Sequence, residues 1–101
     1  MAVYVVAQGR ITDRKVLDEY VDKAIPTLDA HGARVVAFDE NPQVIEGTTE
    51  TPRTVILEFS SHEAFRAWYD SPEYQAILPL RLSAAPGPMI VANGFAPPAA
   101  K

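Results

Sequence analysis

The stretch "ARVVAFDENPQVIEGTTETPRTVILEF", residues 33–59, contains two strand-like runs with no helical pattern between them. Residues 33–40 and residues 53–59 are rich in Val, Ile and aromatic side chains, which is typical of β-strands. The residues that join them, 41–52, include the Pro, Gly and Asn found in turns. We expect a hairpin here, with a short extra strand around Val44 to Glu46.

Toward the N-terminus, a strand-like run at 2–9 is followed by a helical pattern over 13–32. Asp13 or Thr12 can cap the start of this helix, and Gly32 suits the left-handed residue that ends one. Pro26 lies inside the pattern and should kink or split the helix. Its apolar residues recur at helical spacing: Val16, Leu17, Tyr20, Val21, Ala24 and Leu28.

Toward the C-terminus, a second helical segment precedes a last strand-like run at 88–95. Ser60 and Glu63 have the spacing of a capping box at its start. Asp70 or Ser71 can cap a second short helix, with Pro72 at its first position, and Pro79 should end or bend it. The aromatic stripe of the first part, which includes Phe65, Trp68 and Tyr69, is expected to pack on the sheet. The tail 96–101 is predicted to be disordered.

The order is therefore strand, helix, strand, strand, helix, strand. It predicts the α+β class and the ferredoxin-like βαββαβ plan, with a four-stranded antiparallel sheet and the helices on one face. A chain of 101 residues suits one domain, which we place at residues 1–95.

Alternation along the strands divides their side chains between the two faces of the sheet. One set is apolar or small, as a helix-covered face requires: Val3, Val5, Ala7; Ala33, Val35, Ala37; Val55, Leu57, Phe59; Ile90, Ala92, Gly94. The other set is about half apolar: Tyr4, Val6, Gln8; Arg34, Val36, Phe38; Thr54, Ile56, Glu58; Met89, Val91, Asn93. An uncovered face should be mostly polar, so we expect a second copy of the chain to cover it in a two-fold homodimer.

Composition excludes several classes of protein. A net charge of −4 argues against a nucleic-acid surface, and no apolar run is long enough to span a membrane. The chain has no cysteine and no basic residue before its first apolar run, so we expect a cytoplasmic protein. His31 and His62 lack metal-ligand spacing, and no glycine-rich phosphate loop occurs. No metal or other cofactor is therefore expected.

Several pieces of the chain together resemble the domain of unknown function 1330 family. They are "WYDSPEYQ" (68–75), Arg81, Glu46-Gly47, "LEF" (57–59) and the helix-end glycine before Arg34. The resemblance runs from about Tyr4 to Gly94, and the family belongs to the dimeric α+β barrel superfamily. It implies a homodimer with a small-molecule cleft beside each sheet. The chain departs from the family pattern at Gly32-Ala33-Arg34 and at Pro79.

Glu58 and Arg34 are the candidate catalytic residues. They share the half-apolar face with Tyr4, where a partly desolvated carboxylate could act as a base and Arg34 could hold an anion. A structural ion pair is the alternative reading. The candidate substrate-binding residues are Tyr4, Tyr20, Tyr69, Tyr74 and Arg81.

Three functions are compatible with the sequence. By analogy with related dimeric barrels, the protein is a cofactor-independent enzyme of isomerase, lyase or monooxygenase type that acts on a small organic molecule. Alternatively, it is a non-catalytic small-ligand binder or a structural dimer module. A pocket that holds Glu58, Arg34 and a tyrosine favours the enzyme, whereas an apolar pocket favours the binder.

Overall fold

The computed structural model describes residues 1–95, so the predicted disordered tail at 96–101 lies outside it. The elements are, in chain order, β1 (Val3–Gly9), α1 (Arg14–Ala30), β2 (Arg34–Asp39), β3 (Arg53–Phe59), α2 (His62–Tyr69), α3 (Pro72–Ala84) and β4 (Met89–Asn93). The strands form one antiparallel sheet in the order β2-β3-β1-β4. The ferredoxin-like α+β fold predicted from the sequence is confirmed.

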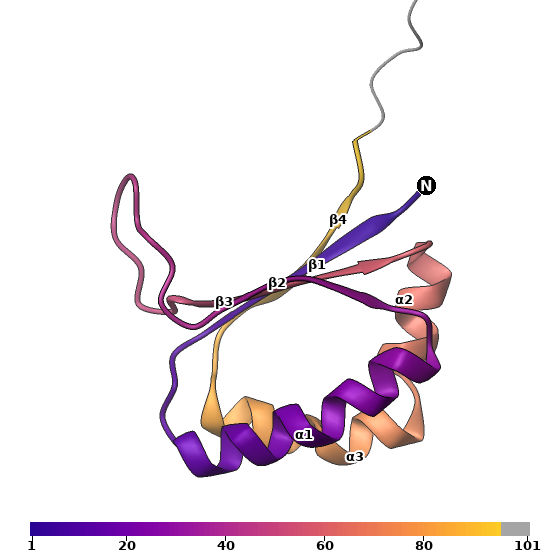
Figure 1. Ribbon diagram of the computed structural model, residues 1–101, viewed down its shortest axis with the longest axis horizontal. Helices are drawn as coiled ribbons and strands as arrows, with labels where there is room; N and C mark the ends of the chain where they lie inside the picture. The colour runs from indigo at the N-terminus through magenta and orange to yellow at the C-terminus, as the bar shows by residue number, and fades with distance from the viewer. Residues whose placement is uncertain (96–101) are drawn as a thin grey trace, which may run out of the picture.

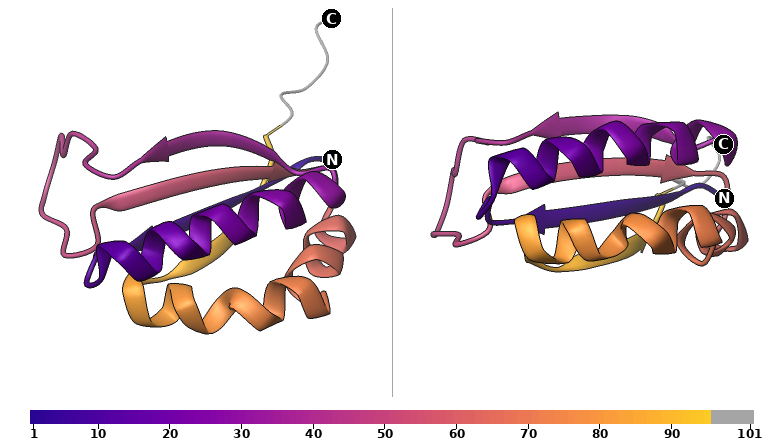
Figure 2. Two further views of the ribbon diagram at one scale, coloured as in Figure 1. Left: turned by 60° about the horizontal axis from the view of Figure 1, so that its bottom comes forward. Right: turned by 90° about the horizontal axis from the view of Figure 1, so that it is seen from below.

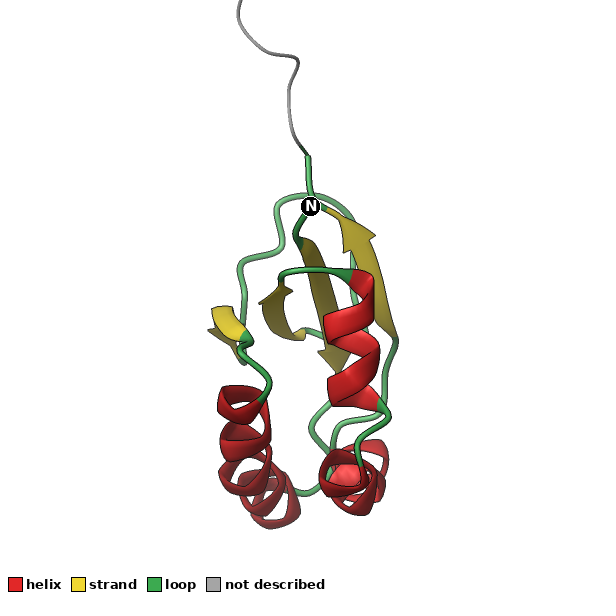
Figure 3. Cartoon of the chain, turned by 90° about the vertical axis from the view of Figure 1, so that its right-hand side faces the viewer, coloured by secondary structure: helices red, strands yellow, loops and turns green. Residues whose placement is uncertain are grey.

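The helices cover one face of the sheet, and we call the other side the open face (Figure 1). Seen from below, α1 and α3 lie side by side and run along the direction of the strands (Figure 2, right). Figure 3 shows that α2 lies near the strands, whereas α1 and α3 stand farther from them. No helix within residues 1–95 is long and apolar enough to cross a membrane.

The helix starts follow from side-chain caps. Asp13, Ser61 and Ser71 each accept a hydrogen bond from a backbone N–H three residues on, at 3.0–3.2 Å. The cap of α2 is therefore Ser61. The capping-box spacing of Ser60 and Glu63 predicts Ser60 instead. Pro72 occupies the first turn of α3, and Gly32 takes the expected left-handed conformation, with φ 70°, after α1.

Neither internal proline ends its helix. α1 runs through Pro26 to Ala30, and α3 runs through Pro79 to Ala84. The carbonyls that lose their helical partner belong to the residues four positions earlier, Asp22 and Gln75, and both of these residues are exposed. Water can therefore satisfy these carbonyls, and the helices continue.

The connection between β2 and β3 contains no strand, so the extra strand expected at Val44 to Glu46 is wrong. Val44 and Ile45 are 49% and 77% exposed, and Gly47 turns the chain with φ 78°. A strand needs a neighbouring backbone to pair with, and this connection leaves its residues in solvent.

A β-bulge in β2 changes the predicted faces of the sheet. Val35 pairs with Leu57 but Ala37 pairs with Ile56, so Val36 is the extra residue. Phe38 consequently lies opposite Val55, on the helix-covered face, and the prediction that placed it on the open face is wrong. Ala37 moves to the open face in the same way.

The faces of β4 are also the reverse of those predicted. Met89 pairs with Ala7 and Val91 pairs with Val5, both on the helix-covered face, while Ile90 pairs with Val6 on the open face. Both sets of β4 side chains are largely apolar or small, so alternation alone could not orient this strand. Its pairing with β1 does.

An aromatic cluster fills the end of the domain where α2 meets the sheet. Trp68 is 1% exposed, and its ring centroid lies 4.0 Å from that of Tyr74 and 5.5 Å from that of Phe59. Its indole N–H donates to the hydroxyl of Thr27 at 2.9 Å, which ties α2 to α1. The prediction that the stripe of α2 is core is confirmed for Phe65 and Trp68, which are both buried.

Trp68→Ala should therefore lower the free energy of unfolding by about 3–5 kcal/mol, as expected for loss of a large buried aromatic residue. Urea denaturation measures the loss, and Glu63→Ala, at an exposed position of the same helix, should change stability by no more than about 0.5 kcal/mol. Trp68 is the one tryptophan of the chain, so a native emission maximum at the wavelength of free tryptophan would contradict its burial.

Candidate functional site

A cavity of about 460 Å³ lies between the sheet and the helices. This volume is typical of small-molecule sites, which range over about 300–1,000 Å³. The inner side of α1 forms one wall, with Tyr20, Val21, Ala24, Ile25 and Leu28. The sheet forms the facing wall with apolar side chains: Ala7, Val35, Phe38, Val55, Leu57 and Met89.

The cavity opens between β2 and α1. Its most exposed lining residues are Val35 and Phe38 on β2, which are 46% and 49% exposed, and Ile25 on α1, which is 47% exposed. Trp68 closes it on the side of the aromatic cluster. The bulge in β2 brings Phe38 to this opening, because without it the ring would lie on the open face.

Three polar side chains line this otherwise apolar cavity: Tyr20, Arg53 and Arg81. Both arginines are almost fully buried, at 3% and 5% exposure. The Nε atoms of both have no hydrogen-bond partner within the described residues. Buried charges are normally paired, so two buried arginines with unpaired Nε atoms distinguish this cavity from an ordinary packing defect in an apolar core.

Arg53 is the first residue of β3, on the same face as Val55, Leu57 and Phe59. Its guanidinium lies over the ring of Phe38, 5.2 Å from the centroid. Burial lowers the pKa of Arg53, and the positive charge of Arg81 lowers it further. The two guanidinium groups therefore act on each other within the same part of the interior.

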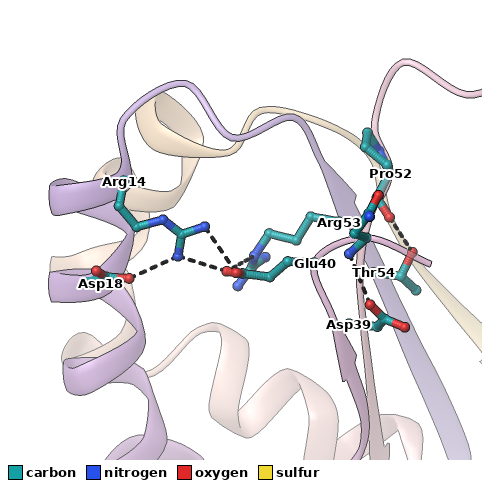
Figure 4. Close-up of polar contacts among 8 residues, drawn as sticks. Arg14, Asp18, Asp39, Glu40, Pro52, Arg53 and Thr54 are labelled. Atoms are coloured by element: carbon teal, nitrogen blue, oxygen red, sulfur yellow. Dashed lines mark hydrogen bonds and ion pairs between the residues drawn. The ribbon is translucent and has the colours of Figure 1, made fainter.

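The acid nearest to Arg53 is Glu40, whose Oε2 lies 4.0 Å from Nε, beyond hydrogen-bond distance (Figure 4). Arg14 holds that carboxylate with two hydrogen bonds, at 2.9 and 3.0 Å, and also donates to Asp18 at 3.1 Å. Bidentate bonds of this kind are among the stronger ion pairs. Arg14 is thus the main ion-pair partner of Glu40, and Arg53 contacts the same carboxylate only at longer range.

Tyr20 and Tyr74 form a buried pair whose hydroxyl oxygens lie 2.8 Å apart, and either can be the donor. Their rings meet edge to face with centroids 6.2 Å apart. Burial raises the pKa of Tyr20 far above its ordinary value, and the hydroxyl of Tyr74 raises it further. Tyr20 is consequently a neutral phenol near pH 7, able to donate a hydrogen bond but not to act as a base.

Glu58 and Arg34 form an ion pair on the open face. Arg34 Nε donates to Glu58 Oε1 at 2.9 Å, and the hydroxyl of Tyr4 donates to Glu58 Oε2 at 2.8 Å. The hydrogen bonds from Arg34 and Tyr4 lower the pKa of Glu58. The side chain of Arg34 is 66% exposed and that of Glu58 25% exposed, and neither lines the cavity.

The structure thus divides the candidate residues between three places. Tyr20 and Arg81 line the cavity, and Tyr74 supports Tyr20 from behind it. Glu58, Arg34 and Tyr4 lie together on the open face, as alternation predicted. Tyr69 is half-buried on α2, stacked on Phe65 with centroids 5.6 Å apart, and lines neither cavity wall. The catalytic and binding roles assigned to these residues stay predictions.

Arg53 is the residue that the sequence analysis missed. The signal was available, because Arg53, Val55, Leu57 and Phe59 are spaced by two and the last three were assigned to the helix-covered face. Extending that set by one step places a guanidinium among apolar side chains. Within residues 1–95, no group of three or more His, Asp and Glu side chains is arranged to hold a metal ion.

Comparison with known proteins places the chain in a family. The family model described as Domain of unknown function (DUF1330) matches residues 2–95. The chain belongs to the DUF1330 family. The resemblance drawn from "WYDSPEYQ" and the smaller pieces is therefore confirmed, and comparison with curated proteins found no match.

Solved structures of other proteins share the ferredoxin-like fold of this chain. A protein of unknown function from Rhodopseudomonas palustris is 16% identical, with a TM-score of 0.77 over 95% of this chain and 84% of that chain. SnoaB, a cofactor-independent oxygenase from Streptomyces nogalater, is 10% identical, with a TM-score of 0.66 over 95% of each chain.

A dimeric ferredoxin-like protein of unknown function from Jannaschia sp. CCS1 is 13% identical, with a TM-score of 0.64 over 95% of this chain and all of that one. At these identities, the likenesses establish the fold of this DUF1330 protein and not its activity.

The ion pair on the open face predicts a pH dependence of stability. The pKa of Glu58 in the folded protein lies below its ordinary value of 4.5. The ionised carboxylate therefore stabilises the folded state fully above pH 4.5, and this stabilisation is lost as the pH falls through the folded-state pKa. Glu58→Gln should therefore destabilise the protein near pH 7, and its stability should approach that of the wild type near pH 3. Urea unfolding at the two pH values measures this, with Glu63→Gln as the exposed control; equal losses at both would contradict it.

Proposed function

We propose that this protein binds a small, largely apolar organic molecule in the cavity between its sheet and helices. The observation that carries the proposal is the apolar cavity of about 460 Å³ that opens between β2 and α1. Globular interiors are normally packed with few voids larger than a water molecule. A cavity of this size costs stability, and a ligand that fills it offsets the cost.

The composition of the wall supports a binder over an acid–base enzyme. Within the described chain, no carboxylate or imidazole lines the cavity. Its one hydroxyl belongs to Tyr20, which is neutral near pH 7. The wall can therefore bind and orient a molecule but supplies no general base of its own.

A cofactor-independent enzyme of isomerase, lyase or monooxygenase type is the second candidate. It is supported by the fold shared with the cofactor-independent oxygenase SnoaB, and by the ionised Glu58 that Arg34 and Tyr4 hold in place. In this reading the substrate meets Glu58 on the open face, beside a partner chain.

We also propose that the protein is a homodimer through the open face. The apolar side chains there include Val36 and Ile90, at 43% and 59% exposure, with Val6 and Ile56 between them on the central strands. A two-fold partner hides this patch twice. The dimeric state of the Jannaschia protein supports the same arrangement, and the cytoplasmic location expected from the sequence stays a prediction.

Ligand binding can be tested with N-phenylnaphthylamine, a neutral dye that fluoresces in apolar surroundings. The wild type should bind it, and Ala24→Leu should weaken binding about tenfold or more, because the added carbons occupy the cavity beside α1. Ala76→Leu adds the same atoms at an exposed position of α3 and should bind as the wild type does. Equal binding by all three proteins, or by none, would contradict a ligand site in the cavity.

The dimer can be tested by sedimentation velocity. The wild type should sediment as a dimer at micromolar concentration. Ile56→Asp should give monomers or insoluble protein, because it buries a charge against apolar surface. Val44→Asp, in the exposed connection before β3, should leave the dimer intact. A monomeric wild type would overturn the proposed interface.

A further inference from the structure

Two permanently charged groups occupy an apolar cavity in this protein. Arg53 and Arg81 are 97% and 95% buried, and neither Nε has a hydrogen-bond partner within residues 1–95. A buried lysine or carboxylate can lose its charge by changing its protonation state. An arginine cannot, because its guanidinium keeps its proton at any ordinary pH. The wall of the cavity therefore carries two positive charges at any ordinary pH.

The chain offers these charges little compensation. Glu40 is the one carboxylate that the structure pairs with either arginine in the described chain, at 4.0 Å from Arg53, and Arg14 already holds it. The aromatic face of Phe38 adds a weak attraction for Arg53. Among residues 1–95, no acid lines the cavity itself. Leaving buried charges without close partners is strongly unfavourable, so a bound anionic ligand would stabilise this arrangement.

We propose that the ligand of this cavity is an apolar carboxylic acid whose carboxylate binds between Arg53 and Arg81, with the hydroxyl of Tyr20 as a further donor. This inference rests on the proposed function and specifies the chemical class of its ligand. The Tyr20–Tyr74 hydrogen bond supports it, because whichever hydroxyl accepts still carries its own proton. Tyr74 can thus donate to Tyr20 while Tyr20 donates to the acid.

The walls limit the rest of the ligand. Apart from these three residues the lining is apolar, which suits a hydrocarbon or aromatic body and not a sugar or a nucleotide. The cavity volume of about 460 Å³ lies in the lower half of the range of about 300–1,000 Å³ that small-molecule sites span. It therefore suits a compact molecule of about two or three rings. Phosphate is the other anion that guanidinium groups commonly bind, so the test includes it.

The test compares naphthoic acid with naphthamide, which has nearly the same shape but no charge. Calorimetry and thermal shift on the wild type should show binding of the acid at least about tenfold tighter than binding of the amide, since hydrogen bonds to charged groups are the stronger ones. Inorganic phosphate should produce no comparable shift. This comparison needs no variant, so it does not depend on whether any substitution folds.

Variants then assign the effect to the two arginines. Arg53→Met and Arg81→Met should each reduce the preference for the acid over the amide, and each should melt no lower than the wild type without ligand, because an unpaired buried charge has been removed. Arg53→Lys should keep part of the preference for the acid. Arg66→Met, at an exposed arginine of α2, should leave that preference unchanged.

The outcomes separate this inference from the proposal on which it rests. If the wild type binds amide as tightly as acid, or binds N-phenylnaphthylamine but neither of these, the acid site is overturned and the apolar cavity stands. A phosphate shift as large as that of naphthoic acid, abolished in Arg53→Met, also overturns it in favour of a phosphate site. An acid preference that is undiminished in both methionine variants overturns the assignment to the arginines. If no probe binds, the proposed function fails as well.

Discussion

The packing of Trp68 against Phe59 and Tyr74 sets the distance between the helices and the sheet. Three large rings fill the end of the domain where α2 meets β3, with Trp68 also bonded to Thr27 of α1. α1 and α3 leave this cluster side by side and standing off the strands (Figures 1 and 2). Because the rings fill only one end, the space beyond them is left as the cavity lined by α1 and the sheet.

This arrangement gives up stability within the single chain. A cavity forgoes the contacts that a packed core would make, and the buried Nε atoms of Arg53 and Arg81 have no hydrogen-bond partner within residues 1–95. Residues that are unfavourable for folding but well placed for binding are typical of functional sites. In this domain they lie together, on one side of the aromatic cluster. The more favourable ion pairs, Arg14–Glu40 and Arg34–Glu58, lie outside the cavity and nearer to solvent.

The sequence predicts the fold well because its strands and helices carry regular patterns. Apolar spacing located α1, and the capping residues Asp13 and Ser71 marked helix starts that the structure confirms. The faces of the sheet were harder. The bulge at Val36 reverses the face of the sheet on which the following side chains of β2 lie, and no local sequence pattern predicts this bulge. In β4, both sets of side chains are largely apolar or small, so only the pairing with β1 shows which one faces the helices.

The candidate site was predictable only in part, for the same reason. Alternation brought Glu58, Arg34 and Tyr4 together correctly, because β1, β3 and the start of β2 pair without irregularity. The cavity depends on how far the helices stand from the sheet, and this is a property of tertiary packing that no spacing in the sequence records. Arg53 is the exception, since its place in the alternation of β3 was visible beforehand.

β3 connects the two proposed functions physically. Its side chains alternate between Arg53, Val55 and Leu57 in the cavity wall and Thr54, Ile56 and Glu58 on the open face. As an inner strand it is paired on both sides, to β2 and to β1, so its backbone is held firmly. Arg53 nevertheless directly follows the long exposed connection that ends at Pro52. A partner chain packed over Ile56 would hold β3 from the open face and so fix the guanidinium of Arg53 in the cavity. The proposed dimerisation through the open face would thus preorganise the proposed site on the other side of the same strand.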